Sequence, residues 1–154
     1  MSENSGLVRA ILSQLPYITL ATATKDGLPW NVPVYAACDE AFNFFWVSAK
    51  YARHSQNIRA NQRVAIVVYD STVPSGTGKG VYIEARAYEL ADEQECSHAL
   101  ACLQKRGWED PPSVDMVLGA TLRGAYKAVP ENMWINTEDE HGLDGRVQVD
   151  MSEL

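Results

Sequence analysis

The sequence predicts a mostly β domain of the α+β class, built as a small closed or partly open antiparallel barrel. Strand-like segments rich in β-branched and aromatic residues follow one another from residue 17 to residue 48, with only turns between them. The Lys25-Asp26-Gly27 turn carries the Asp-Gly pair that is typical of hairpins. A doubly wound βαβ fold is excluded, because it would need a helix between successive strands.

The first half of the chain begins with a short amphipathic helix over residues 5–14, which Pro16 ends. Pro33 lies within the second strand-like segment, and proline cannot donate to the hydrogen-bond ladder of a sheet. We therefore expect that strand at a sheet edge or at a bulge. The segments expected as strands in this half are residues 17–24, 29–37 and 42–48.

The second half contains the same two kinds of element. Residues 81–90 alternate apolar and polar side chains, as a half-buried strand does, and residues 92–106 carry an apolar face at helical spacing. The Ser, Pro and Gly content of residues 71–80 predicts a loop. The other expected elements are a helix over 50–60, strands over 64–69, 122–129, 133–136 and 146–149, and a break over 107–112.

Length and composition indicate a single cytoplasmic domain spanning residues 1–154, which is long enough to bury one core. The formal net charge of −7 argues against a broad nucleic-acid-binding surface, which needs clustered positive charge. The odd number of cysteines, three, fits a reducing compartment. No signal peptide and no membrane-spanning window is recognisable, so neither nucleic acid nor membrane is expected as a partner.

Two apparent motifs do not meet the requirements of the sites they suggest. Residues 75–80 resemble a phosphate-binding loop, but a Walker loop needs Ser or Thr after Lys79, where a glycine stands. A flexible loop is the better interpretation. On a helix, Cys96 and His98 point to nearly opposite sides, and no fourth ligand lies near Cys102, so we expect no zinc site there.

One stretch of this acidic chain carries only positive charge. Residues 41–69 contain no Asp or Glu, although the whole chain has 20 acids against 13 Lys and Arg. In the expected helix over 50–60, the i, i+3, i+4, i+7 spacing puts four polar side chains on one face, and Ser48 is a candidate cap. This strand–helix joint is either an anion site or a solvated helix face. The four side chains are Lys50, Arg53, His54 and Asn57.

This stretch resembles the flavin-binding split-barrel family related to pyridoxamine 5′-phosphate oxidase. The resemblance implies a six-stranded antiparallel split β-barrel with short helices. It also implies a homodimer that binds FMN at the interface between its subunits. The matching segments are TATKDGLPWNVPVYAA, FFWVSAKYARHSQNIRANQRVAIVVYDST, GVYIEARAYEL and YKAVPENMWIN, of which the second is the most specific.

The resemblance also implies which residues hold the FMN phosphate. Val47 and Ser48 match the strand end that lines the cofactor, and Asn57 matches the Gln or Asn of the following helix. Arg53 and His54 match an Arg/Lys pair that binds the phosphate. His54 departs from the more usual lysine, and a neutral imidazole contributes less charge. Lys50 has no counterpart in the oxidases proper but is a physically reasonable substitute as a phosphate ligand.

The flavin ring is expected over the second strand. The segment matching the backbone that faces the isoalloxazine ring consists of Asn31, Val32, Pro33 and Val34. Trp134 is a looser candidate for the neighbourhood of the ring. The C-terminal residues depart from the arrangement that holds the vitamin B6 phosphate in the oxidases proper, because His141 and Arg146 stand among acids. Vitamin B6 oxidation is therefore not expected.

The function implied by the resemblance is that of an FMN-dependent oxidoreductase acting on a small-molecule substrate. A flavin carries out hydride and electron transfer itself, so no catalytic nucleophile or base is required of the sequence. The alternatives are a deazaflavin or haem binder on the same barrel, a non-enzymatic flavin-binding protein, and a barrel that has lost its cofactor.

Overall fold

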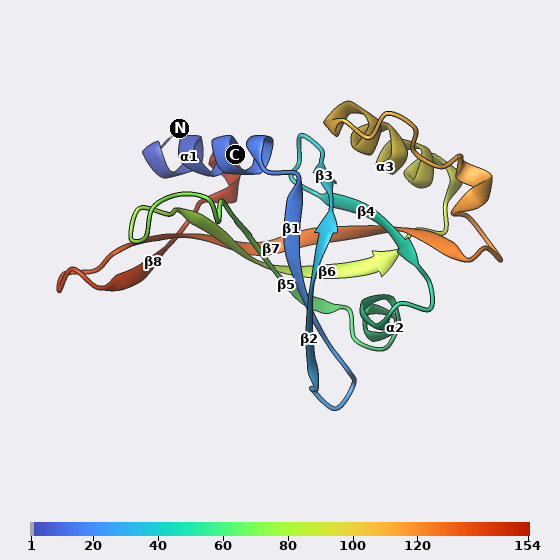
Figure 1. Ribbon diagram of the computed structural model, residues 1–154, viewed down its shortest axis with the longest axis horizontal. Helices are drawn as coiled ribbons and strands as arrows, with labels where there is room; N and C mark the ends of the chain where they lie inside the picture. The colour runs from blue at the N-terminus through green and yellow to red at the C-terminus, as the bar shows by residue number, and fades with distance from the viewer. Residues whose placement is uncertain (1) are drawn as a thin grey trace.

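The computed structural model describes residues 2–154, which form one curled antiparallel sheet with three α-helices around it (Figure 1). The strands are β1 (Tyr17–Ala23), β2 (Pro29–Tyr35), β3 (Ala37–Cys38), β4 (Phe44–Ala49), β5 (Arg63–Tyr69), β6 (Gly80–Glu89), β7 (Arg123–Glu138) and β8 (Asp144–Gln148). The helices are α1 (Glu3–Gln14), α2 (Arg53–Ala60) and α3 (Glu93–Arg106), with 3₁₀ turns η1 (Val114–Met116) and η2 (Met151–Glu153).

The order of the strands explains why the sheet curls. It runs β2-β1-β5-β6-β7-β4-β3, and β8 pairs with β7 beside this path. The two ends of the order, β2 and β3, are separated in sequence only by Ala36. One continuous segment thus pairs with β1 at one edge and with β4 at the other. The sheet is drawn into a partly open barrel, which confirms the predicted split-barrel class.

The strand count differs from the six that the family resemblance implies, because the structure has eight strands. One extra strand is the two-residue β3, a continuation of the second strand beyond a bend. The other is β8, which matches the strand expected over 146–149 and folds back on the end of β7 as a hairpin. The expected strands over 122–129 and 133–136 are a single 16-residue strand, β7. A register shift between Glu84 and Ala85 of β6 lies opposite the gap between these two expected strands, and it lets β7 continue through that gap.

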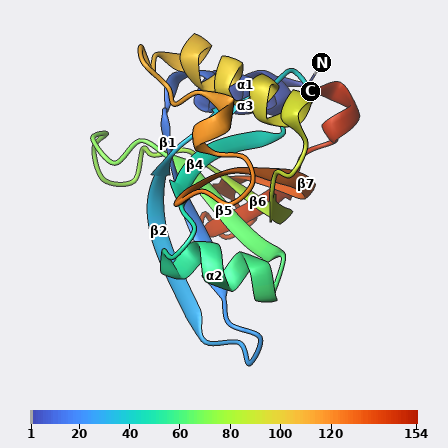
Figure 2. The ribbon, with the colours of Figure 1, turned by 90° about the vertical axis from the view of Figure 1, so that its right-hand side faces the viewer.

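The core lies on the concave side of the sheet. Strand β5 shows the alternation, since Val64, Ile66 and Val68 are buried whereas Ala65 is exposed. Helix α1 packs Val8 on the same cluster, and α3 packs on a second cluster together with residues of β4 and β7. Figure 2 shows α1 and α3 at the top of the curled sheet and α2 at the bottom, where Ile58 of α2 joins the same core cluster as Val8. None of the helices described is both long and apolar enough to cross a membrane.

Helix α2 begins later than the sequence spacing suggests. Its first residue is Arg53 and its N-cap is Ala52, without a side-chain capping bond. The predicted start at Lys50 and the predicted Ser48 cap are therefore wrong. Residues 50–52 form a turn instead, because the Lys50 backbone N–H bonds to the Leu122 carbonyl and holds the chain against the segment before β7.

Candidate functional site

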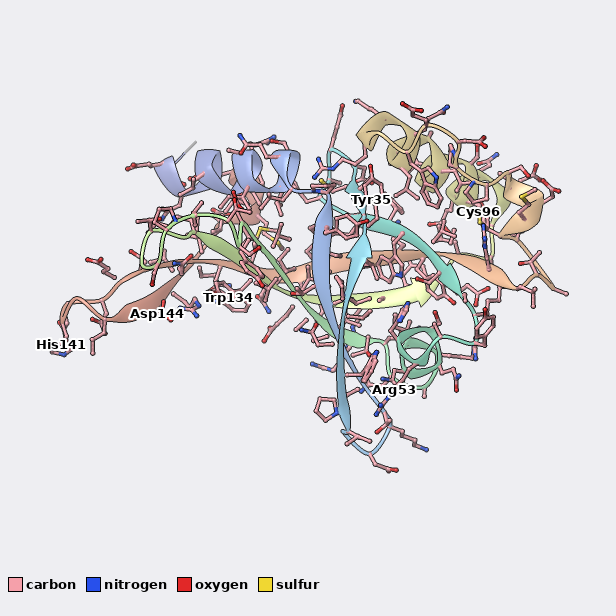
Figure 3. All side chains as sticks on the ribbon, viewed as in Figure 1. Tyr35, Arg53, Cys96, Trp134, His141 and Asp144 are labelled. Atoms are coloured by element: carbon pink, nitrogen blue, oxygen red, sulfur yellow. The ribbon has the colours of Figure 1, made fainter. Side chains whose placement is uncertain are left out.

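A cleft of about 760 Å³ runs along β2, between α2 and the loop that follows α3. Ligand sites of small molecules typically have this volume and an apolar lining. Figure 3 shows Arg53 near the α2 end of β2 and Tyr35 near the opposite end. The lining residues are Tyr17, Val32, Pro33, Val34, Tyr35, Val47, Ser48, His54, Gly107, Trp108, Glu109 and Asp110.

The floor of the cleft is apolar. Val32, Pro33 and Val34 come from β2, and Val47 comes from β4. β2 is the edge of the sheet order, and it pairs with β1 from Pro29 to Tyr35 without a register shift. Pro33 thus marks an edge, as predicted, and not a bulge. An edge strand offers one row of backbone N–H and carbonyl groups, and no strand among residues 2–154 pairs with this row of β2.

Two polar side chains close the α2 end. The His54 imidazole Nε2 lies 2.8 Å from the Ser48 hydroxyl, which joins the start of α2 to the end of β4. His54 is only 9% exposed, and burial lowers the pKa of its imidazole below the ordinary value. The imidazole is therefore neutral at neutral pH, and it offers one donor and one acceptor rather than a positive charge.

The guanidinium of Arg53 stands beside this end but outside the lining of the cleft. Its central carbon lies 4.5 Å from the centroid of the Trp30 ring, which is a cation–π arrangement. Arg53 is exposed and forms no ion pair with any acid among residues 2–154. Its charge is thus available at the α2 end of the cleft.

Two other members of the predicted helical face are engaged elsewhere. The Lys50 ammonium contacts the Glu89 carboxylate at 2.5 Å and the Gly119 carbonyl at 2.6 Å. The Asn57 side chain is buried and donates to the Thr22 hydroxyl at 3.0 Å. These contacts tie the α2 region to β6 and β1. The prediction that all four side chains share one helical face is wrong, because Lys50 precedes the helix.

Neither Asn31 nor Trp134 lines the cleft of a single chain. Asn31 is exposed on β2. Trp134 pairs in register with Tyr82 and Gln148, and Figure 3 shows it on the far part of the sheet from Arg53 and Tyr35. The structure therefore gathers Val32, Pro33, Val34, Val47, Ser48 and His54 in the cleft, with Arg53 beside them.

The opposite end of the cleft is formed by aromatic residues that no sequence motif indicates. Tyr17, Tyr35 and Trp108 form a row of edge-to-face contacts, with ring centroids 5.6 Å apart for the first pair and 6.3 Å for the second. Trp108 belongs to the segment that was predicted only as a break after the helix. A tryptophan in a polar loop was the one signal in the sequence that pointed to a role for this segment.

Gly107 directs residues 107–110, which follow α3, into the cleft. It ends α3 with φ +122°, a conformation that favours glycine, and the following Trp108 N–H bonds back to the Leu103 carbonyl. Glu109 and Asp110 come next and line the same end of the cleft. The C-terminus of α3 thus supplies an aromatic ring and two carboxylates to a site otherwise built by β2, β4 and α2.

A second cavity of about 860 Å³ lies between α1, α3 and the segment joining β3 to β4. His98 and Cys102 line it one helical turn apart, with Nε2 and Sγ 3.6 Å from each other. The other cysteine of the sequence motif, Cys96, is buried, and its Sγ faces the Leu90 carbonyl instead. Within residues 2–154 no group of three or more His, Cys, Asp or Glu side chains is arranged to hold a metal ion.

Comparison with known proteins identifies a family and a fold. The sequence profile described as pyridoxamine 5′-phosphate oxidase matches residues 6–121. No curated protein matches the chain. A solved structure of a FAD-binding protein from Mesorhizobium loti is similar with a TM-score of 0.63 and 23% identity, covering 97% of this chain and 96% of that one.

Two haem proteins have the same fold. The haem storage protein HutZ from Vibrio cholerae is similar with a TM-score of 0.69 and 17% identity, covering 84% of this chain and 92% of that one. A haem-binding protein from Mycobacterium smegmatis is similar with a TM-score of 0.72 and 16% identity, covering 94% of this chain and 57% of that one. At such identities the likeness concerns the fold alone, and the fold accommodates more than one kind of cofactor.

Proposed function

This chain belongs to the pyridoxamine 5′-phosphate oxidase family, and we propose that it is an FMN-dependent oxidoreductase acting on a small-molecule substrate. The observation that carries the proposal is the cleft along β2, which has an apolar floor and polar groups at its α2 end. FMN has the matching chemistry, with a flat ring system and a phosphate on a flexible chain. When bound, the flavin supplies hydride and electron transfer, so the chain needs no nucleophile–base pair of its own.

The α2 end of the cleft fits the phosphate. The Ser48 hydroxyl and the His54 imidazole offer hydrogen bonds inside the cleft, and Arg53 adds a positive charge beside it. Charge-assisted hydrogen bonds from a guanidinium to phosphate are among the strong ones. We assign Arg53 the main electrostatic role, because the buried imidazole of His54 is neutral.

The floor fits the ring system. Val32 and Val47, which are partly buried, line the apolar floor together with the buried Val34, and the isoalloxazine ring would lie over them. The free edge of β2 offers backbone donors and acceptors for the polar rim of the ring. Asn57 and Lys50 do not face the cofactor. Their contacts with Thr22 and Glu89 hold α2 and the turn before it in place. They position the cleft rather than bind the cofactor.

We propose in addition that the chain works as a homodimer. Aromatic side chains stand on the face of the sheet that points away from the core, where Tyr17 is 60% exposed and Tyr69 is 50% exposed. Trp134 and its neighbour Tyr82 also point away from the core, because they alternate with buried residues along β7 and β6. Exposed aromatic surface of this kind is typical of protein interfaces. In a dimer, Trp134 would be presented to a second copy rather than to its own cleft.

An absorption spectrum tests the cofactor. Protein purified and then incubated with FMN should show the two flavin bands after free FMN is removed. A protein that stays colourless, and does not change FMN fluorescence on titration, contradicts the proposal. Oxidation of a reduced nicotinamide by the loaded protein, with a small electron acceptor present, would then separate an enzyme from a non-enzymatic flavin carrier.

One observation favours a haem binder as the second candidate. His54 places a neutral imidazole in an apolar cleft, and a neutral histidine is the usual axial ligand of haem iron. The two haem proteins with the same fold are consistent with this possibility. Haem binding would give a Soret band that His54→Ala shifts or abolishes, whereas a bound deazaflavin would give neither a Soret band nor the bands of FMN.

A further inference from the structure

Resting on the proposed function, we infer that the end of the cleft formed by Tyr35, Trp108, Glu109 and Asp110 binds the substrate, and that this substrate is a planar aromatic cation. The substrate would bind in the same cleft as the flavin. Three features of this end indicate a planar aromatic cation: its position, its aromatic wall and its charge.

The aromatic end of the cleft lies at the opposite end from the proposed phosphate site. His54 and Ser48 close the cleft beside α2, whereas Gly107 to Asp110 close it beside α3. Figure 3 shows the two ends of β2 marked by Arg53 and Tyr35. From Val32 to Tyr35 an extended strand spans about 10 Å, enough for a ring system to lie between the two ends. A cofactor anchored by its phosphate at α2 thus leaves the aromatic end facing a second ligand.

The aromatic wall is preorganised for a flat ring. Tyr35 sits between Tyr17 and Trp108, with interplanar angles of 79° and 85°. Edge-to-face contacts on both sides hold the Tyr35 ring in one orientation. Trp108 is only partly exposed, so its ring is held by packing while part of its surface remains open to the cleft. Aromatic faces attract both flat rings and cations.

The charge at this end is negative. Glu109 and Asp110 line the cleft and are exposed, and neither forms an ion pair with any residue of the described chain. No Lys or Arg among residues 2–154 lines the cleft, and its one histidine, His54, lies at the other end. Two uncompensated carboxylates beside aromatic rings repel an anionic substrate and attract a cationic one.

A matched series of ligands tests the inference. N-methylquinolinium, quinoline and quinoline carboxylate share one flat ring system and carry a positive, zero and negative charge at neutral pH. Calorimetric titration of the FMN-loaded protein should give the tightest binding for the cation. We expect its affinity to exceed that of the anion by at least about tenfold at low salt, with the difference shrinking as salt is added. Equal affinities, or a preference for the anion, would overturn the inference.

Two double variants locate the effect. Glu109→Gln with Asp110→Asn should reduce the preference for the cation to about threefold or less while leaving FMN binding intact. Asp26→Asn with Glu93→Gln removes the same number of exposed carboxylates, at the β1–β2 turn and at the start of α3, and should keep the preference. If both variants lose the preference equally, the net charge of the protein and not this end of the cleft is responsible.

The same titrations separate this inference from the proposed function. Absence of FMN binding, with the cation still preferred by the FMN-free protein, would remove the flavin assignment and leave the charge selectivity in place. Normal FMN binding without any preference for the cation would remove the substrate class alone. Trp108→Leu adds a second readout, because it should weaken all three ligands by losing the ring contact and yet preserve their order.

Discussion

At the scale of single residues, the cleft depends on a histidine that burial keeps neutral. His54 is tied to Ser48 and is 9% exposed, and no charged neighbour shifts the pKa of its imidazole. Burial alone lowers that pKa from its ordinary value of about 6.5. The folded chain therefore binds a proton at this site less readily than the unfolded chain does. Protonation must destabilise the folded state.

This gives a pH dependence with a definite sign. The contribution of His54 to the free energy of unfolding is fully present above its unfolded pKa and is lost as the pH falls toward the lower, folded pKa. Urea denaturation between about pH 7 and pH 5 should show a loss of stability that is smaller in His54→Gln. His141→Gln is the control, because His141 is exposed in the β7–β8 turn. Identical pH slopes for the wild type and His54→Gln would contradict the assignment.

Arg53 and Lys50 are predicted to separate binding from stability. Arg53→Ala removes the free charge at the α2 end and should weaken FMN binding by about tenfold or more, since a hydrogen bond to a charged group is worth roughly 1.5–3 kcal/mol. Lys50→Ala breaks the contacts to Glu89 and Gly119, so it should lower the melting temperature and change FMN affinity little. Fluorescence titration and thermal unfolding measure the two effects. If Lys50→Ala lost as much FMN affinity as Arg53→Ala, Lys50 would belong to the phosphate site.

At the scale of elements, one side chain joins two helices. Arg106, at the end of α3, donates to the carbonyls of Leu12, Ser13 and Leu15 at the end of α1. Carbonyls at a helix C-terminus have no partner within the helix, and the helix dipole favours a cation there. Figure 2 shows the two helices on the same side of the sheet. The guanidinium thus replaces a C-terminal cap that the sequence of α1 does not provide.

Removing this link should destabilise the fold. Arg106→Ala leaves three carbonyls without their donor, and we expect it to reduce the free energy of unfolding by roughly 2–3 kcal/mol. Arg86→Ala is the matched control, because Arg86 forms an exposed ion pair with Glu131 at 2.7 Å, and such pairs contribute about 1 kcal/mol or less. Chemical denaturation of both variants measures the difference. Similar losses would mean that the contacts of Arg106 with α1 contribute little.

The turn after α3 is a second element-scale determinant. Gly107 has φ +122°, and any other L residue would be strained there. Gly107→Ala should cost about 1 kcal/mol or more and displace Trp108 from the row of aromatic rings. The near-ultraviolet circular dichroism spectrum, which reports on fixed aromatic side chains, should change with it. An unchanged spectrum would show that the row does not depend on this turn.

At the scale of the whole molecule, the barrel is closed by one segment and left open along the cleft. Residues 29–38 bridge the two ends of the strand order, so the strand that lines the cleft also holds the barrel together. The outward face of the sheet carries exposed aromatic rings, among them Tyr17 and Tyr69. This combination favours a second copy of the chain as the partner that covers that face.

A dimer is therefore the expected state in solution. Light scattering coupled to size-exclusion chromatography should give about twice the mass of one chain. Tyr69→Lys places a charge on the outward face and should shift the equilibrium toward the monomer, whereas Tyr51→Lys, at an exposed position in the turn before α2, should not. A monomer at all concentrations would contradict the proposal.

Much of the fold follows from local patterns in the sequence. Strands β1, β2, β4, β5 and β6 and the helices α1 and α3 lie close to their expected ranges, because alternation and helical periodicity are properties of neighbouring residues. Pro33 correctly placed β2 at an edge. The basic stretch and the family resemblance together singled out Ser48 and His54, which do line one cleft with the β2 segment. These residues are close in sequence to the elements that present them.

The tertiary structure alone decided which side chains are free to act. Lys50 is held by Glu89 and Gly119, and Asn57 by Thr22, and all three partners are distant in sequence. Likewise, Trp108 reaches the cleft only because α3 packs across β4 and ends beside Tyr35. Periodicity determines which face of an element a residue occupies. The register and packing of the whole sheet determine what that face meets. The sequence by itself therefore determined that Ser48 and His54 stand at one strand–helix joint, whereas packing alone decided that Trp108, Glu109 and Asp110 line the other end of the same cleft.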